Sequence, residues 1–398
     1  MKHIVFLTIN DIESINESTI YNDLIHDFIN RNYKVTIVSP TSIDKKPCIN
    51  INNNLKIIKP KIINYKTKNI LVKGLSLITL DYSFIKYVKK YLKNEPIDLV
   101  LYATPPISLI KTITYIKKKT GARSYLLLKD IFPQNAVDID ILRKTSIIYK
   151  IFRIKEKKLY KISDKIGCMS KRNVDYVLKN NPEIKDEKVE VNPNSIDVSR
   201  NTISKVSKKR LREKYNLPQN KKIYVYGGNV GRPQGIDFLL EVIKLSKSDN
   251  HFLIIGDGTD FYKINEFKDK YGLSNLTVLT KAPVSVYLEL VSACDIGIIL
   301  LDKRFTIPNF PSRILSYMLA KLPVIALTDK QSDIGSIITD NNFGFWAEHG
   351  DIKATLEIID RFKNENIINE MGKESYNYLI NNYQTSVSST KIINFLEE

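Results

Sequence analysis

Residues 224–236 read YVYGGNVGRPQGI and are the strongest local signal in the chain, because an apolar strand runs into a loop with four glycines that a helix follows. Glycine lets backbone N–H groups approach an anion closely, and the amino terminus of the following helix adds partial positive charge. Arg232 adds a full charge on a planar fork that matches a diphosphate. A tight left-handed turn is the alternative interpretation. The segment is neither a GxxxxGK[ST] loop nor a GxGxxG loop.

A second glycine-containing junction follows the next predicted strand, Phe252–Ile255, where the chain continues as IGDGT. Gly256 and Gly258 therefore lie where a nucleotide cleft is expected, at the carboxyl end of a strand. Taken alone, this junction indicates little.

Residues 305–317, FTIPNFPSRILSY, form a third junction between a strand and a helix. Proline is favoured in a first helical turn, which predicts that the helix begins at Pro311. Free N–H groups there, together with Ser312 and Arg313, predict a second anion site. The alternative is that Arg313 is a solvated charge on the helix surface.

Strand and helix signals alternate twice along the chain, with a polar, aperiodic segment between the two series. This alternation predicts two parallel, doubly wound α/β domains. The expected strands of the first series are 4–9, 34–39, 98–102, 124–128, 165–169 and 189–191, and those of the second are 223–226, 252–255, 276–279, 296–300 and 323–326. We place the first domain at residues 1–198, the linker at 199–209, the second domain at 210–380, and a terminal helix at 381–398 that could pack back on the first domain.

The charge of the chain is unevenly distributed. Of the formal net charge of +18, residues 1–200 carry +16, with 36 Lys and Arg against 20 Asp and Glu. This asymmetry predicts that the first half faces an anionic partner, which could be nucleic acid, an anionic lipid or a phosphorylated substrate. A general enrichment in Lys, Asn and Ile is the alternative explanation, although it fits the balanced second half poorly. The three cysteines form no CxxC pair, which favours a reducing compartment and no zinc site.

Asp130 follows the predicted strand 124–128 and so lies at a carboxyl strand end. Its carboxylate could orient a sugar or act as a base, while Lys129 could pair with phosphate. The alternative is that Asp130 caps a helix. We assign none of the four histidines to catalysis.

The junctions together resemble glycosyltransferase family 4. The residues that carry the resemblance are GGNxGxxQG, GxG and PNFPSRxLSYM, with the segments 11–16, 127–135, 191–197 and 342–346. The combination is similar to the WbuB-like branch, typified by L-fucosamine transferases of O-antigen and capsule assembly. The resemblance implies a GT-B fold, in which two Rossmann-like domains face a central cleft.

The resemblance also implies the roles of individual residues. The carboxy-terminal domain would hold a UDP-sugar, as a substrate and not a cofactor, without the help of a metal ion. The amino-terminal domain would hold a lipid-linked saccharide acceptor. The expected catalytic residues are Asp130 and Lys129, and the expected acceptor residues are Asp11, Thr104 and Pro105. The expected donor residues are Gly227, Gly228, Asn229, Gly231, Arg232, Gln234, Gly256, Gly258, Asn309, Phe310, Ser312, Arg313 and Ser316.

The chain departs from the wider family at three places. The family's Glu-x7-Glu pair falls on Pro308 and Ser316. The family's basic residues of the phosphate loop fall near Asn229 and Gln234, which leaves Arg232 between them as the basic residue. The amino-terminal Gly-Gly loop is replaced by residues 11–18. Because both carboxylates are missing, the family's contacts to sugar hydroxyls do not transfer to this chain.

Three other functions compete with sugar transfer. A nucleic-acid-binding protein would explain the charge, but we find no RRM, KH or helix-turn-helix signature. A protein that only binds a nucleotide-sugar would explain the missing Glu pair. An epimerase of the same fold would need more acid/base carboxylates around the cleft than this sequence offers.

Residues 146–162 form a predicted helix rich in isoleucine and lysine. One interpretation is an interfacial helix at a membrane, and the favoured one is a domain helix that buries its apolar stripe and leaves a solvated basic face. Either way the basic face would attract an anionic leaflet, so we expect a peripheral enzyme on the cytoplasmic face of a bacterial inner membrane.

Overall fold

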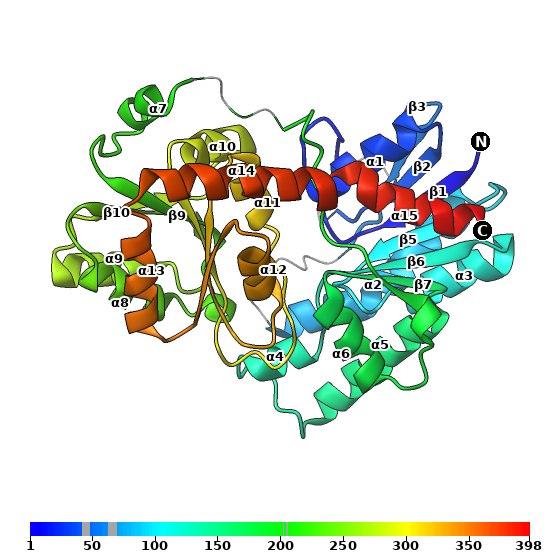
Figure 1. Ribbon diagram of the computed structural model, residues 1–398. Helices are drawn as coiled ribbons and strands as arrows, with labels where there is room; N and C mark the ends of the chain where they lie inside the picture. The colour runs from blue at the N-terminus through cyan, green and yellow to red at the C-terminus, as the bar shows by residue number, and fades with distance from the viewer. Residues whose placement is uncertain (42–47, 63–69, 202, 204–205) are drawn as a thin grey trace. The chain divides into compact units, whose positions relative to one another are not determined.

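The computed structural model describes residues 1–41, 48–62, 70–201, 203 and 206–398, and it divides the chain into two compact units. Unit 1 comprises Met1–Asp197 and Thr385–Glu398, and unit 2 comprises Val198–Gln384. Figure 1 shows strands and helices alternating along both units. Each unit is an α/β Rossmann-like domain built on a mainly parallel sheet.

In the described residues, unit 1 is built on an eight-stranded sheet in the order β3-β4-β2-β1-β5-β6-β7-β8, whose pair β3 and β4 is antiparallel. Its apolar strands are short and almost wholly buried, as expected for a sheet covered on both faces. The strands are β1 (His3–Leu7), β2 (Lys34–Val38), β3 (Cys48–Asn52), β4 (Leu55–Ile58), β5 (Leu99–Ala103), β6 (Arg123–Leu128), β7 (Lys165–Cys168) and β8 (Val189–Val191).

The helices of unit 1 cover both faces of this sheet. They are α1 (Ile20–Asn30), α2 (Ile70–Tyr91), α3 (Ile110–Thr120), α4 (Gln134–Asp138), α5 (Ile147–Ile162), α6 (Lys171–Asn180), the 3-10 turn η1 (Asp186–Lys188) and α15 (Thr385–Glu397). Helices α1 and α15 lie side by side and share one apolar core with β1, β2 and β5 (Figure 1). Helix α3 contacts α2 and α5.

Unit 2 is built on a six-stranded sheet, parallel throughout the described part, in the order β11-β10-β9-β12-β13-β14. The strands are β9 (Lys222–Asn229), β10 (Asn250–Asp257), β11 (Leu276–Thr280), β12 (Ile296–Leu300), β13 (Val324–Thr328) and β14 (Gly344–Glu348). The helices are α7 (Lys208–Lys214), the 3-10 turn η2 (Arg232–Gln234), α8 (Ile236–Leu245), α9 (Tyr262–Tyr271), α10 (Val284–Ser292), α11 (Ile314–Leu319), α12 (Ile334–Asp340), α13 (Ile352–Arg361) and α14 (Glu365–Asn382).

Two sequence-based expectations about helices are wrong. Helix α11 begins at Ile314 and not at Pro311, because residues 311–316 are joined by tight i to i+3 hydrogen bonds, such as Leu315 N to Ser312 O at 3.1 Å. In α5 the apolar stripe is not buried as a whole, since Leu159 is buried while Ile147, Ile148, Ile151 and Ile154 are exposed. Among the described helices, none is long and apolar enough to cross a membrane.

Candidate active site

The glycine loop of unit 2 lies at the carboxyl end of β9 and is closed by one buried side chain. Gln234 Oε1 accepts hydrogen bonds from the backbone N–H of Gly231 and from Nδ2 of Asn229, both at 3.0 Å. Gly228 and Asn229 are exposed, and Gly228 has a φ of 120°, a conformation that favours glycine. Gln234 therefore supports the loop from inside and leaves the backbone of Gly228 open.

Gly256, in the last residues of β10, and Gly258, just after it, allow that strand to approach the loop closely. A Cβ on Gly256 would lie 1.9 Å from the carbonyl oxygen of Gly228, and a Cβ on Gly258 would lie 2.1 Å from that of Val230. A side chain at either position would force the ends of β9 and β10 apart. Gly256 and Gly258 thus shape the loop from behind.

Arg313 lies beside this loop with a charge that no described side chain neutralises. Its guanidinium carbon is 4.4 Å from the centre of the Tyr226 ring, and its Nη1 is buried without a hydrogen-bond partner. A Cβ built on Gly228 would lie 3.4 Å from that guanidinium carbon. A cation held beside an open glycine backbone, at a carboxyl strand end, can bind an anion such as a diphosphate.

Tyrosines that the sequence analysis did not select hold Arg313 and the loop in place. Tyr317 Oη accepts from the N–H of Gly227 at 3.0 Å and donates to the carbonyl of Ile298 at 3.2 Å. Tyr287 packs so close to Gly227 that a Cβ there would overlap its ring. Burial raises the pKa of Tyr287 to about 12, so its hydroxyl is protonated at neutral pH.

The other predicted donor residues differ in exposure and in their contacts. Arg232 and Ser312 are exposed, and no described residue forms an ion pair with Arg232. The N–H of Asn309 donates to Ser332 Oγ at 3.0 Å, whereas Phe310 is buried against Tyr383. The hydroxyl of Ser316 lies near that of Tyr287. Phe310 is thus a packing residue, and the others remain candidates for contact with a ligand.

His349 is a further residue at this edge, at the end of β14. Burial lowers its pKa, so the ring is neutral at pH 7. Its Nε2 is 3.1 Å from the carbonyl of Gly235, which requires the proton on Nε2 and leaves the buried Nδ1 as an acceptor without a partner. His349 thereby holds the glycine at which α8 begins.

In unit 1, Thr104 fixes the segment that carries Lys129 and Asp130. Its Oγ1 accepts from the N–H of Lys129 at 3.1 Å and donates to the carbonyl of Asp130 at 3.2 Å. Burial lowers the pKa of Lys129 to about 7. Asp130 lies at the surface, yet the surrounding protein reduces its hydration enough to raise its pKa to about 6. A group with such a pKa can exchange protons near neutral pH.

Asp11 and Pro105 lie on neighbouring loops at the carboxyl ends of β1 and β5. Pro105 is exposed, and Asp11 forms an ion pair with Lys59, whose side chain is only 1% exposed. Lys59 also donates to the carbonyl of Ile12 at 2.9 Å. The sequence analysis missed Lys59 because the strand before it was not predicted and a lysine usually reads as a solvated charge.

Asn194 is another residue at this edge with an unused polar atom. It follows β8, and its Oδ1 is buried without a partner among the described residues. The carboxyl edge of unit 1 therefore presents Asp11, Thr104, Lys129, Asp130 and Asn194. Among the described residues, no group of three or more His, Cys, Asp and Glu side chains is arranged to hold a metal ion.

Comparisons with known proteins show what this chain is similar to. Residues 207–385 match the family described as glycosyl transferases group 1. The chain is 27% identical over 317 residues to a protein described as "Probable glycosyltransferase WbjE" from Pseudomonas aeruginosa, which covers 78% of this chain and 76% of that protein.

Solved structures share the fold at low sequence identity. A complex of HepE from Anabaena with UDP-glucose has a TM-score of 0.72 at 13% identity, and the match covers 100% of this chain and 100% of that chain. WaaG, a glycosyltransferase involved in lipopolysaccharide biosynthesis, has a TM-score of 0.67 at 13% identity over 97% of this chain and 98% of its own. The prediction of a GT-B fold is confirmed, and the comparisons support a glycosyltransferase.

Proposed function

We propose that this protein transfers an N-acetylated sugar from a UDP-sugar to a lipid-linked saccharide acceptor during assembly of a bacterial O-antigen or capsule. The acceptor would be carried on undecaprenyl diphosphate, and the enzyme would belong to the WbuB-like branch of family 4. Its place would be the cytoplasmic face of the inner membrane. The observation that carries the proposal is the buried, unpartnered Nη1 of Arg313 beside the open backbone of Gly228.

The chemistry follows from what the departing UDP requires. Breaking the bond between the sugar and the diphosphate places negative charge on the leaving oxygens, and preorganised donors that meet this charge lower the barrier. The N–H groups of Val230 and Gly231 already donate to the carbonyl of Asp257 and to Gln234. Arg313 and Arg232 are therefore the donors available in unit 2. These groups supply cations and donors without a metal ion, so we expect transfer to continue in the presence of EDTA.

We further propose that transfer proceeds with retention of anomeric configuration. The leaving phosphate would help to deprotonate the acceptor, so that no protein nucleophile is required. Asp130, with its pKa of about 6, is the side chain that we assign to orient the sugar or take up a proton. Lys129 would face phosphate, and Asp11, Thr104 and Pro105 would contact the acceptor.

The test is incubation with a panel of UDP-sugars and a saccharide linked to undecaprenyl diphosphate, followed by mass spectrometry of the products. Extension of the acceptor by one N-acetylhexosamine is the expected result. Isomerisation of the UDP-sugar without extension would instead identify an epimerase. An NMR spectrum of fresh product with an inverted anomeric centre would refute retention.

A further inference from the structure

Helix α5 exposes an apolar stripe that the proposed active site does not use. Ile147, Ile151 and Ile154 are 74%, 49% and 54% exposed, and Ile148 is 56% exposed. Ile141, in the turn that precedes the helix, is 63% exposed. Side chains of this size gathered on one helix face, and not scattered singly, mark an interaction surface.

This exposure does not result from a loosely attached helix, because α5 is fixed to unit 1 along its length. At its start, Tyr149 Oη donates to Oε1 of Gln134, in α4, at 3.1 Å. In its middle, buried Glu156 accepts from Arg153 at 2.6 Å and from Tyr160 at 2.8 Å. Arg153 also donates to the carbonyl of Asn180, at the end of α6.

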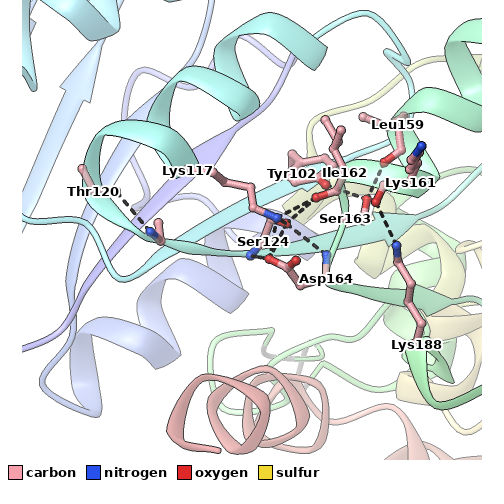
Figure 2. Close-up of polar contacts among 11 residues, drawn as sticks. Tyr102, Lys117, Thr120, Ser124, Leu159, Lys161, Ile162, Ser163, Asp164 and Lys188 are labelled. Atoms are coloured by element: carbon pink, nitrogen blue, oxygen red, sulfur yellow. Dashed lines mark hydrogen bonds and ion pairs between the residues drawn. The ribbon is translucent and has the colours of Figure 1, made fainter.

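Figure 2 shows how the end of α5 is held by side chains around β6 and β7. The carbonyl of Ile162 accepts from Lys117 Nζ at 2.7 Å, and the carbonyl of Lys161 accepts from Lys188 Nζ at 3.1 Å. The hydroxyl of Ser163, the C-cap residue of α5, hydrogen-bonds the hydroxyl of Tyr102 at 2.6 Å. The isoleucines therefore point outward from a helix whose rotation is set by its other face.

The rotation of the helix separates two faces. At 100° per residue, Glu156, Leu159 and Tyr160 form the inner face. Ile147, Ile151 and Ile154 lie within about 40° of the opposite direction by the same rule. One turn further on, Lys158 and Lys161 continue the same outer stripe. The outer face is thus apolar over its first two turns and cationic over its last two.

Within residues 141–162 the exposed charged side chains are all cationic, and one of them, Lys157, is paired with Glu183. Between residues 141 and 162 the one acidic residue is Glu156, which is buried and paired with Arg153. The exposed charged residues of this segment are Arg143, Lys144, Lys150, Lys157, Lys158 and Lys161. A cationic rim around an apolar stripe complements the headgroups and acyl chains of an anionic bilayer.

We propose that the outer face of α5, formed by Ile147, Ile151 and Ile154 with the lysines around them, inserts into the surface of an anionic bilayer. The isoleucines would enter the boundary between headgroups and acyl chains while the lysines contact phosphate. A second copy of this chain is a poorer occupant, because it would bring two cationic rims together. The inference rests on the proposed function only in that it gives the enzyme a route to a lipid-linked acceptor.

The experiment is vesicle flotation of the full chain with phosphatidylcholine vesicles and with vesicles that also contain phosphatidylglycerol. We expect binding to the anionic vesicles that high salt weakens without abolishing, because the apolar contact is insensitive to screening. The variant Ile147→Asn/Ile151→Asn/Ile154→Asn should bind at least about tenfold more weakly. The variant Lys150→Gln/Lys158→Gln/Lys161→Gln should lose the salt-sensitive part.

A matched control is Leu245→Asn, which removes an exposed apolar side chain of unit 2. It should bind vesicles as the wild type does. A second readout is Ile151→Trp, whose fluorescence should be quenched by brominated lipids, whereas Trp346, the one native tryptophan, lies in unit 2. Because all the substituted residues on α5 are exposed, an unchanged melting temperature confirms that the variants are folded.

Wild-type binding by the triple isoleucine variant would overturn the proposal. So would an absence of vesicle binding by the wild type, whether accompanied by isoleucine-dependent dimerisation or by binding of a DNA duplex. UDP affinity is measured on the same samples. Unchanged UDP affinity in the isoleucine variant separates a failure of the membrane surface from a failure of the donor site in unit 2.

Discussion

Nη1 of Arg313 is buried in unit 2 without a hydrogen-bond partner among the described residues, and a charged group in this state costs stability unless a ligand completes it. We expect Arg313→Ala to weaken UDP binding by about tenfold or more, since a charge-assisted hydrogen bond contributes roughly 1.5–3 kcal/mol. The apo protein should not lose comparable stability. Isothermal titration with UDP and thermal melts of the same samples measure both effects.

We expect Arg232→Ala to weaken UDP binding as well, because the exposed Arg232 lies in the same glycine loop. Arg210, an exposed residue of α7, is the matched control, and Arg210→Ala should leave UDP affinity unchanged. Unaltered UDP affinity in both Arg313→Ala and Arg232→Ala would contradict the assignment of the donor site.

Asp130 gives a prediction about pH. Its pKa is raised to about 6, so the fold disfavours the charged carboxylate. If Asp130 must be ionised, kcat/KM falls as the pH drops below about 6, and Asp130→Asn removes this limb of the profile together with most of the activity. A pH profile of the wild type without a transition near 6 would exclude this role.

The same shift has a consequence for stability. The folded state binds the proton of Asp130 more tightly than the unfolded state does, so this residue lowers stability as the pH rises through 6. We expect Asp130→Asn to be more stable than the wild type at pH 8 and equally stable below about pH 4, the unfolded pKa. Urea denaturation at the two pH values tests this sign.

At the scale of elements, the ends of β9 and β10 depend on Gly256. Its replacement by alanine would place a Cβ 1.9 Å from the carbonyl oxygen of Gly228, so the two strand ends must separate. We expect Gly256→Ala to destabilise unit 2 by about 1–3 kcal/mol and to weaken UDP binding strongly. Gly272→Ala is the control, because its φ of 59° carries a strain cost while nothing lies within 4 Å. It should affect stability alone, as urea denaturation and UDP titration would show.

The sequence predicted most elements of the two sheets because their strands are short apolar runs separated by turn residues. The predicted strand 252–255 lies within β10, and 296–300 coincides with β12. The strands β3 and β4 were not predicted, since β3 reads CININ and alternates with asparagine. Strand β14 was noticed only as part of a family motif, because its five residues follow no alternating pattern.

The candidate site could be predicted less completely, because pairing across long sequence distances decides it. The glycine loop and Arg313 were selected from local patterns. The position of Arg313 on Tyr226, 87 residues earlier, follows from the packing of α11 against β12 and from the hydrogen bond between Tyr317 and Gly227. It leaves no local signal in the sequence. Likewise, helical periodicity in α5 identified its apolar residues but could not tell that Glu156 and Tyr160, and not the isoleucines, face the protein.

At the scale of the whole molecule, the chain leaves unit 1 after Asp197 and returns to it at Thr385. The returning helix α15 completes the core of unit 1 with Ile392, Phe395 and Leu396. Phe395 packs edge-on against Tyr125, with the ring centres 5.7 Å apart, and lies under the guanidinium of Arg123. The last residues of the chain are therefore part of the folding unit that contains the first.

This arrangement predicts that a substitution near the carboxyl terminus weakens the amino-terminal unit. Phe395→Ala should lower the stability of unit 1 by about 3–5 kcal/mol, because it leaves a cavity between α15 and the sheet. UDP affinity should not change, since the donor residues lie in unit 2. Phe362, fully buried in unit 2 against Phe345, is the matched control. Phe362→Ala should destabilise unit 2 and lower the temperature at which UDP binding is lost.

Urea denaturation can follow the two units separately, with Trp346 fluorescence for unit 2 and circular dichroism for the whole chain. We expect Phe395→Ala to shift the circular dichroism transition to lower urea while the Trp346 transition stays in place. A shift of both transitions together would mean that the two units unfold as one, and a loss of UDP affinity in Phe395→Ala would mean that α15 supports the donor site as well.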